Sequence, residues 1–246
     1  MRLTRIHVPG PLAPGSEITL PAQSGEHLMR VLRLEPGAAF TLFDGRGGEY
    51  AARLAPRSGK AVRAQVLAHA AVERESRLDV TLLQGIARGE RMDVIVQKST
   101  ELGVTRIVPV STARSVVRVD AKQRERKREH WQAVAVSACE QCGRNRVPEV
   151  AAPLALADAL ASMPAQSRGL LLAADAGQAL VAAVRGLVAP LVLLIGPEGG
   201  LAEDEERLAL SRGFLACRLG PRILRTETAG LAALAALQAV AGDFGG

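Results

Sequence analysis

The residues best suited to chemistry lie near the C-terminus, in two stretches rich in glycine and proline. The first, Gly196-Pro-Glu-Gly-Gly200, follows the apolar run 191–195 with no polar spacer. An apolar run that contains β-branched residues predicts a strand buried on both faces. Because glycines let a ligand approach the main chain closely, the loop after this strand predicts a small-molecule site.

The residues after this loop limit what it can bind. The helix expected there opens with four acids, Glu203-Asp-Glu-Glu206. Phosphate-binding loops are instead followed by a helix N-terminus with Lys, Ser or Thr. The chain has no GxxxxGK[ST] motif, and the loop lacks the spacing of GxGxxG. The pattern therefore favours a neutral or cationic ligand over a nucleotide polyphosphate.

The second stretch, 219–229, reads Leu-Gly-Pro-Arg-Ile-Leu-Arg-Thr-Glu-Thr-Ala. It places two arginines and a glutamate beside apolar residues in a loop. From Ala229 to Val240 the residues are almost entirely Ala and Leu, with Gln238 as the polar exception. A helix that is apolar all round must be buried, so we expect a subunit interface or a tightly threaded core.

The predicted secondary structure around these stretches changes from mainly strands to alternating strands and helices at about residue 75. Before it, short apolar runs alternate with turn signals such as Pro36-Gly37 and Asp44-Gly45, which predicts a small β-barrel with one helix capped by Ser24. After it, strands and helices alternate, with a helix at 91–102 and a long one at 120–138. This order predicts an α/β fold with a mainly parallel sheet and helices on both faces.

The amino-acid composition and the net charge limit the kinds of partner that the protein can bind. Hydrophobic residues make up 48% and aromatic residues 2%, so an RNA surface built on stacking aromatics is not expected. The net charge of +6 suits a polyanionic partner. No apolar run approaches the roughly 20 residues that span a bilayer, and the N-terminus has no signal-peptide core, so we expect a cytoplasmic protein.

Cys139 and Cys142 form a CxxC without a second pair of zinc ligands, so ordinary thiols and no metal are expected.

Taken together, these motifs resemble the bacterial 16S ribosomal RNA (uridine-N3) methyltransferases of the SPOUT (trefoil-knot) superfamily. The resemblance rests on GPEGG, on RILRTETA at 222–229 and on the Ala/Leu helix. Four upstream segments extend it over essentially the whole chain: HLMRVLR at 27–33, FDGR at 43–46, QKSTELGV at 97–104 and EQCGR at 140–144. It implies a PUA-like, RNA-binding β-barrel at 1–75. It also implies a knotted methyltransferase domain at 76–246 that binds S-adenosylmethionine and dimerises.

The resemblance also implies site residues. Those expected to bind the cofactor are Leu172, Ala173, Ile195, Gly196, Pro197, Gly199, Leu219, Gly220, Ile223, Leu224 and Thr226. Those expected to contact RNA are Arg5, Arg30, Arg33, Arg46 and Arg144. S-adenosylmethionine carries a sulfonium cation and no phosphate, which agrees with the acid-rich surroundings of the loop. The expected partners are 16S RNA in the small ribosomal subunit and a second copy of the chain, bound through the Ala/Leu helix.

Methylation at N3 of uridine requires the loss of a weakly acidic imide proton. Arg225 is the candidate for stabilising the resulting anion, and Glu198 or Glu227 for accepting the proton or orienting the base. Structural roles are the alternative: Glu227 would cap the buried helix, and Arg225 would pair with a carboxylate.

Two other functions stay open at the level of sequence. One is an RNA-binding module without catalysis, such as a ribosome assembly factor, which the barrel and the basic charge would suit. The other is a knotted methyltransferase that acts on tRNA or on a ribose hydroxyl. The glycine loop and RILRTETA count against the first, and the N-terminal barrel counts against the second.

Overall fold

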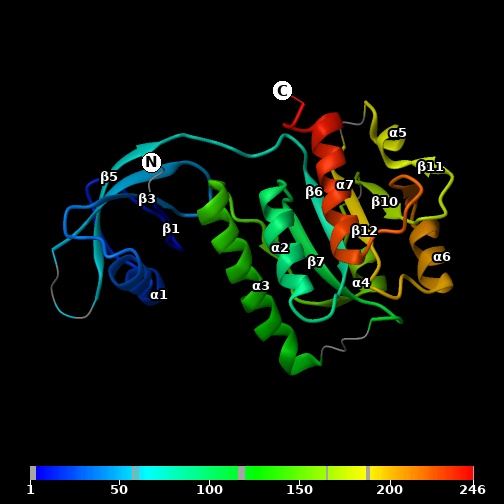
Figure 1. Cartoon of the computed structure of the whole chain (residues 1–246), viewed down its shortest axis with the longest axis horizontal. Helices are drawn as coiled ribbons and strands as arrows, with labels where there is room; N and C mark the ends of the chain where they lie inside the picture. Colours follow the sequence, from blue (N-terminus) through cyan, green and yellow to red (C-terminus); the bar gives the residue numbers. More distant parts are fainter. Residues whose placement is uncertain are drawn as a thin grey trace. The chain divides into compact units, whose positions relative to one another are not determined.

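The computed structural model describes residues 4–56, 59, 61–115, 120–164, 166–186 and 189–245 (Figure 1). Its contacts divide the chain into two compact units. The N-terminal unit consists of Met1–Glu75 and Cys139–Val147, and the C-terminal unit of Ser76–Ala138 and Pro148–Gly246. The later segment of the N-terminal unit lies far along the chain from its other residues, so a long-range return of the chain completes this unit.

The N-terminal unit contains a five-stranded sheet with the order β1-β3-β4-β5-β2. Its strands are β1 (Arg5–His7), β2 (Glu17–Thr19), β3 (Ala39–Phe43), β4 (Glu49–Leu54) and β5 (Arg63–Ala70). The predicted turn at Asp44-Gly45 joins the antiparallel strands β3 and β4 into a hairpin, and Gly45 there has a φ of +81°. Apolar side chains from all of these strands pack in one cluster, to which the fully buried Leu28 also belongs.

The helix of this unit differs from its prediction. Helix α1 (Ala22–Glu26) begins before Ser24 and continues directly into a π-helix, η1 (His27–Val31). Pro21 stands at the N-cap and no side chain caps the helix, so Ser24 is inside it. A Cβ on Gly25 would lie 2.8 Å from Cβ of Val62, so the packing surface of α1 requires glycine there.

The C-terminal unit contains an eight-stranded sheet with the order β11-β13-β10-β12-β6-β7-β8, and β9 pairs with β7. All of its strand pairs are parallel, which confirms the predicted fold class. The strands are β6 (Val80–Gly85), β7 (Arg106–Ser111), β8 (Glu149–Val150), β9 (Leu154–Ala155), β10 (Arg168–Leu172), β11 (Gln178–Ala179), β12 (Leu191–Ile195) and β13 (Leu215–Arg218). The helices are α2 (Arg91–Glu101), α3 (Ala121–Cys142), α4 (Leu156–Ala161), α5 (Leu180–Val184), α6 (Glu203–Ser211) and α7 (Thr226–Ala241).

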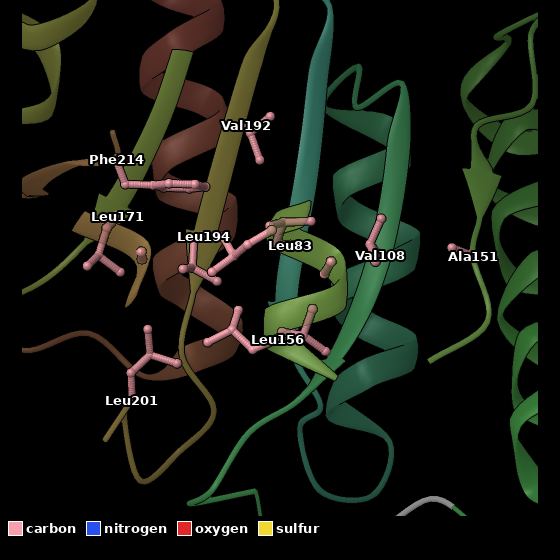
Figure 2. Close-up of a cluster of buried hydrophobic side chains, with 13 residues drawn as sticks. Leu83, Val108, Ala151, Leu156, Leu171, Val192, Leu194, Leu201 and Phe214 are labelled. Atoms are coloured by element: carbon pink, nitrogen blue, oxygen red, sulfur yellow. The ribbon is translucent and has the colours of Figure 1, made fainter. Parts of the chain in front are cut away.

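Helices α2 and α5 each contact α7, whereas α4 contacts α6 (Figure 1). Figure 2 shows Leu83, Val192 and Leu194 on the side of the sheet that faces Leu156 of α4. Every residue of β12 is buried, as the apolar run predicted. Helix α3 extends to Cys142 rather than ending at residue 138, so the CxxC and the first three residues of the EQCGR segment are helical. None of the helices in the described ranges combines the length and the apolar character that a membrane span requires.

Gln238, the polar residue of the Ala/Leu helix, is 1% exposed. Its amide accepts a hydrogen bond from the Ser76 hydroxyl (2.6 Å) and donates one to the carbonyl of Leu102 (2.9 Å). Gln238 therefore joins α7 to the end of α2 and to the start of the C-terminal unit. A Cβ on Gly103, whose φ is +82°, would lie 2.6 Å from Nε2 of Gln238, so this contact also explains the glycine after α2.

Changing Gln238→Leu should lower the free energy of unfolding by about 1–3 kcal/mol, because it leaves the half-buried carbonyl of Leu102 without a donor and the Ser76 hydroxyl without an acceptor. Denaturant unfolding followed by circular dichroism measures this difference. Gln178→Leu is the matched control, since Gln178 is exposed. Equal stability of the two variants would contradict the role assigned to the buried amide.

Candidate active site

The loop Gly196-Pro-Glu-Gly-Gly200 lies directly against the C-terminal end of β6. A Cβ on Gly85 would lie 2.4 Å from the nitrogen of Pro197, so the two backbones can approach this closely only with glycine at this position. The loop turns at Gly200, which has a φ of +68° and donates its amide hydrogen to the carbonyl of Pro197 (2.9 Å). No local sequence pattern marks Gly85, because its partner lies more than a hundred residues away along the chain.

A buried chain of hydrogen bonds connects β6, this loop and α7. The amide nitrogen of Gln84 donates to the hydroxyl of Thr226 (2.9 Å), and this hydroxyl donates to the carbonyl of Gly196 (2.7 Å). Gln84 is fully buried and Thr226 is 6% exposed. Hydrogen bonds in such a low-dielectric environment are strong and costly to break. They fix the first residue of the loop to the first residue of α7.

The loop, the end of β10 and the start of α7 enclose a cavity of about 460 Å³. A smaller cavity of about 90 Å³ shares Leu172, Ala173, Ile223 and Leu224 with it and reaches Leu219 and Gly220. Every residue predicted to bind the cofactor lines one or both cavities. The three catalytic candidates, Glu198, Arg225 and Glu227, line the larger one. The structure thus brings together predicted residues that lie up to 55 positions apart, from Leu172 to Glu227, although their roles stay predictions.

Glu198 is held in place by α2 and the segment before it. Its carboxylate accepts hydrogen bonds from the backbone amide of Arg88 (2.9 Å) and from the side chain of Arg91 (2.8 Å). Burial opposes ionisation, but the hydrogen bonds from these two groups and from its own backbone amide outweigh it, so the pKa of Glu198 lies below its usual range. Glu198 is therefore an anion at neutral pH.

Arg91 is the residue of this site that the sequence analysis missed. Its guanidinium also lies 3.7 Å from the carboxylate of Glu227, so it bridges the two candidate acids. Arg91 is the first residue of α2, and the sequence marked it only as the start of that helix. Since Glu198 and Glu227 are both far from it in the chain, spacing alone could not reveal the bridge.

The alternatives considered for Glu227 and Arg225 are not the arrangements observed. No side chain caps α7, and Oε2 of Glu227 is buried without a hydrogen-bond partner in the described structure. Arg225 occupies the N-cap position of α7 and is exposed. Within the described ranges, its guanidinium forms no ion pair.

The arginines predicted to contact RNA fall into two groups. Arg5 and Arg144 are 7% and 5% exposed. Arg5 pairs with Glu49 (2.6 Å) and Arg144 with Glu75, so both guanidiniums are bound inside the N-terminal unit. Arg30, Arg33 and Arg46 are exposed there. The contacts of the first group hold the segment after α3 in this unit, because Arg5 also binds Asn145.

The CxxC places one buried cysteine, Cys139, and one half-buried cysteine, Cys142, at the end of α3. Burial raises the pKa of the Cys139 thiol to about 12, which leaves it protonated and unreactive at neutral pH. Its sulfur contacts the carbonyl of Arg146 (3.6 Å). Within the described ranges, no three His, Cys, Asp or Glu side chains are grouped so that they could hold a metal ion.

Comparisons with known proteins agree with the motifs. The family model of an RNA methyltransferase domain matches residues 74–238, and that of an RNA methyltransferase PUA domain matches residues 20–67. The ribosomal RNA small subunit methyltransferase E of Bacillus subtilis is 35% identical over 232 residues, which cover 92% of this chain and 90% of that protein.

Two solved structures are similar over nearly their whole length. A methyltransferase from Legionella pneumophila in complex with S-adenosylmethionine is 39% identical, with a TM-score of 0.92 and coverage of 99% of this chain and 100% of that one. A ribosomal RNA small subunit methyltransferase E from Neisseria gonorrhoeae, bound to S-adenosylmethionine, is 40% identical, with a TM-score of 0.91 and the same coverage. The two family models, the relatives and the shared fold lead to one conclusion: this chain belongs to the ribosomal RNA small subunit methyltransferase E family.

Proposed function

We propose that this protein is an S-adenosylmethionine-dependent methyltransferase that methylates N3 of a uridine in 16S RNA of the small ribosomal subunit. The names of its relatives support the class of RNA, and the resemblance of the motifs supports the atom. The observation that carries the proposal is the glycine-lined cavity between β10, β12 and α7, in which the predicted cofactor and catalytic residues meet. We expect a protein with this activity on ribosomal RNA to be cytoplasmic.

The residues of the cavity fit the cofactor. A Cβ on Gly196 would lie 3.1 Å from the backbone of Gly200, so glycine at this position lets the loop fold tightly on itself at the edge of the cavity. The charged side chains around the cavity are Asp175, Glu198, Glu206 and Glu227 against Arg91 and Arg225. This excess of carboxylates favours a sulfonium cation and disfavours a polyphosphate. When bound, S-adenosylmethionine supplies an electrophilic methyl group.

The side chains around the cavity have different roles in the methylation of the base. The target base must leave its stack to reach them. Glu227 is suited to accept the N3 proton, because its buried Oε2 has no other hydrogen-bond partner in the described structure. Glu198 has a lowered pKa and is a weaker base, and its two hydrogen bonds suit it to hold Arg91 in position. Arg225 is free to stabilise the negative charge that develops on the uracil ring.

The N-terminal unit contributes RNA contacts on this proposal. Arg30, Arg33 and Arg46 are exposed, and the ion pair between Arg30 and Glu26 is itself open to solvent, so these guanidiniums can reach phosphates. Arg5 and Arg144 act by holding their unit together rather than by touching RNA, because their guanidiniums are bound to Glu49 and Glu75.

A methyl-transfer assay tests the function directly. Labelled S-adenosylmethionine is incubated with undermethylated small subunits, naked 16S RNA or tRNA, and the product nucleosides are identified by mass spectrometry. We expect 3-methyluridine in the ribosomal RNA. Transfer only to tRNA, or to a ribose hydroxyl, would favour the related knotted methyltransferases. RNA binding without transfer would favour the non-catalytic module.

Changing Glu227→Gln should lower kcat by about 10²–10⁴-fold, the usual contribution of a general base, while cofactor affinity stays within a few fold. Glu206→Gln is the matched control, because it removes the same charge from the same cavity. Single-turnover kinetics and calorimetry separate the two effects. Equal kcat losses in both variants would show that only the charge of the cavity matters.

We also propose that α7 forms the interface of a homodimer. Leu234 is fully buried within its own chain and packs in the subunit core, so it is unsuited to test the interface. Leu231 is only half-buried, and Thr228 and Ala239 on the same helix are exposed. These three residues are spaced so that they lie on the same side of α7, and this side, which contains both apolar and polar residues, faces solvent in the single chain.

Changing Leu231→Glu should convert the dimer into a monomer at micromolar concentration, because it would bury an unpaired charge in the interface. Light scattering measures the mass. Leu210→Glu is the control, since Leu210 is 47% exposed on α6. A wild-type monomer, or dissociation by both variants alike, would refute this interface.

A further inference from the structure

A second cavity of the C-terminal unit, of about 540 Å³, lies between the start of α2 and the first half of α3. We call it the α2–α3 cavity. Its lining residues are Ala87, Gly89, Glu90, Asp93, Gln123, Arg126, Lys127, His130 and Trp131. None of them lines the candidate active site. Its volume is within the roughly 300–1,000 Å³ of small-molecule pockets.

One wall of this cavity is fixed by polar contacts. The carboxylate of Asp93 accepts a hydrogen bond from the indole nitrogen of Trp131 (3.1 Å) and contacts Nε2 of His130 (2.9 Å). The ammonium group of Lys127 lies 5.3 Å from the centre of the Trp131 ring. Trp131 itself is 3% exposed, so it is a rigid part of the wall rather than a platform on which a base could stack.

The other polar groups of the cavity are exposed and carry opposite charges on its two sides. Arg126 and Gln123 stand on α3, and Glu90 stands at the start of α2. In the part of the chain that the structure describes, neither Arg126 nor Glu90 is in an ion pair. A simple anion would be repelled by Glu90, and a simple cation by Arg126. A nucleotide can pair with both residues, because its anionic phosphate can bind Arg126 and the N–H donors of its base can bind Glu90.

The α2–α3 cavity is connected to the candidate active site by one short segment. The amide of Arg88 and the side chain of Arg91 both bind Glu198 of the active-site loop. Gly89 and Glu90, between these two arginines, line the α2–α3 cavity. A strand of RNA that delivers a uridine to Glu198 would therefore pass next to this second cavity.

We propose that the α2–α3 cavity binds a neighbouring nucleotide of the RNA substrate, with its phosphate at Arg126 and Lys127 and its base edge facing Glu90. The cavity is thus a second subsite for the RNA, beside the one that receives the target uridine. This inference rests on the proposed function, since it assumes a single-stranded RNA substrate.

Trp131 provides a direct probe, because it is the single tryptophan of the chain. A single-stranded RNA decamer is titrated into the full-length protein while the fluorescence of Trp131 is recorded, and its affinity is measured by anisotropy at several salt concentrations. The variants are Arg126→Glu and the control Arg124→Glu, which makes the same charge change at an exposed position of α3 outside the cavity. Methyl transfer to undermethylated small subunits is measured with the same preparations.

We expect RNA to change the emission of wild-type protein and of Arg124→Glu, but not that of Arg126→Glu. Arg126→Glu should weaken RNA binding about tenfold and reduce the slope of log affinity against log salt by about one, as for one lost phosphate contact. RNA binding without a response of Trp131, equal weakening by both variants, or no binding to wild-type protein would overturn the subsite. If the wild-type protein transfers no methyl group, the proposed function is refuted. The fluorescence response of Trp131 would still show whether RNA binds in the α2–α3 cavity.

Discussion

The candidate active site depends on one close backbone contact, that between Gly85 at the end of β6 and the Gly196–Pro197 peptide. Parallel pairing of β12 with β6, with Ile195 opposite Gln84, brings these segments together. The buried Gln84–Thr226–Gly196 hydrogen bonds then attach α7 to the same point. The cavity, the orientation of Glu198 and the start of α7 all follow from this junction. A side chain at position 85 would disturb them together.

Electrostatics gives the site its chemical character. Glu205 of the acidic helix α6 does not face a ligand, because its carboxylate accepts hydrogen bonds from the backbone amides of Ala202 (2.9 Å) and Ala113 (2.8 Å). It anchors the loop after β7 instead. Glu198 is similarly bound by Arg88 and Arg91, whereas Oε2 of Glu227 is buried and unpartnered. Two carboxylates near one arginine thus have different environments, and this difference is what allows them different roles.

Sequence patterns predicted what depends on nearby residues. The apolar run of β12, the Asp-Gly hairpin and the glycine loop each carry a local signal, and the parallel sheet follows from the alternation of strands and helices. Arg91 and Gly85 carry no such signal, because their function depends on partners more than a hundred residues away. The burial of Arg5 and Arg144 and the return of Cys139–Val147 to the N-terminal unit are also long-range effects. The prediction that Ser24 caps the helix is wrong, because Pro21 is the N-cap residue and the helix begins at Ala22.

The most direct test of the central contact is calorimetric titration of S-adenosylmethionine into Gly85→Ala. The added methyl group would lie 2.4 Å from the nitrogen of Pro197, so it displaces the loop without entering the ligand cavity. Gly177→Ala is the control, because a Cβ at that glycine meets no atom within 4 Å. We expect Gly85→Ala to remain folded and to lose at least tenfold in affinity, while the control binds like the wild type. Unchanged affinity in a folded Gly85→Ala protein would show that this contact does not shape the site.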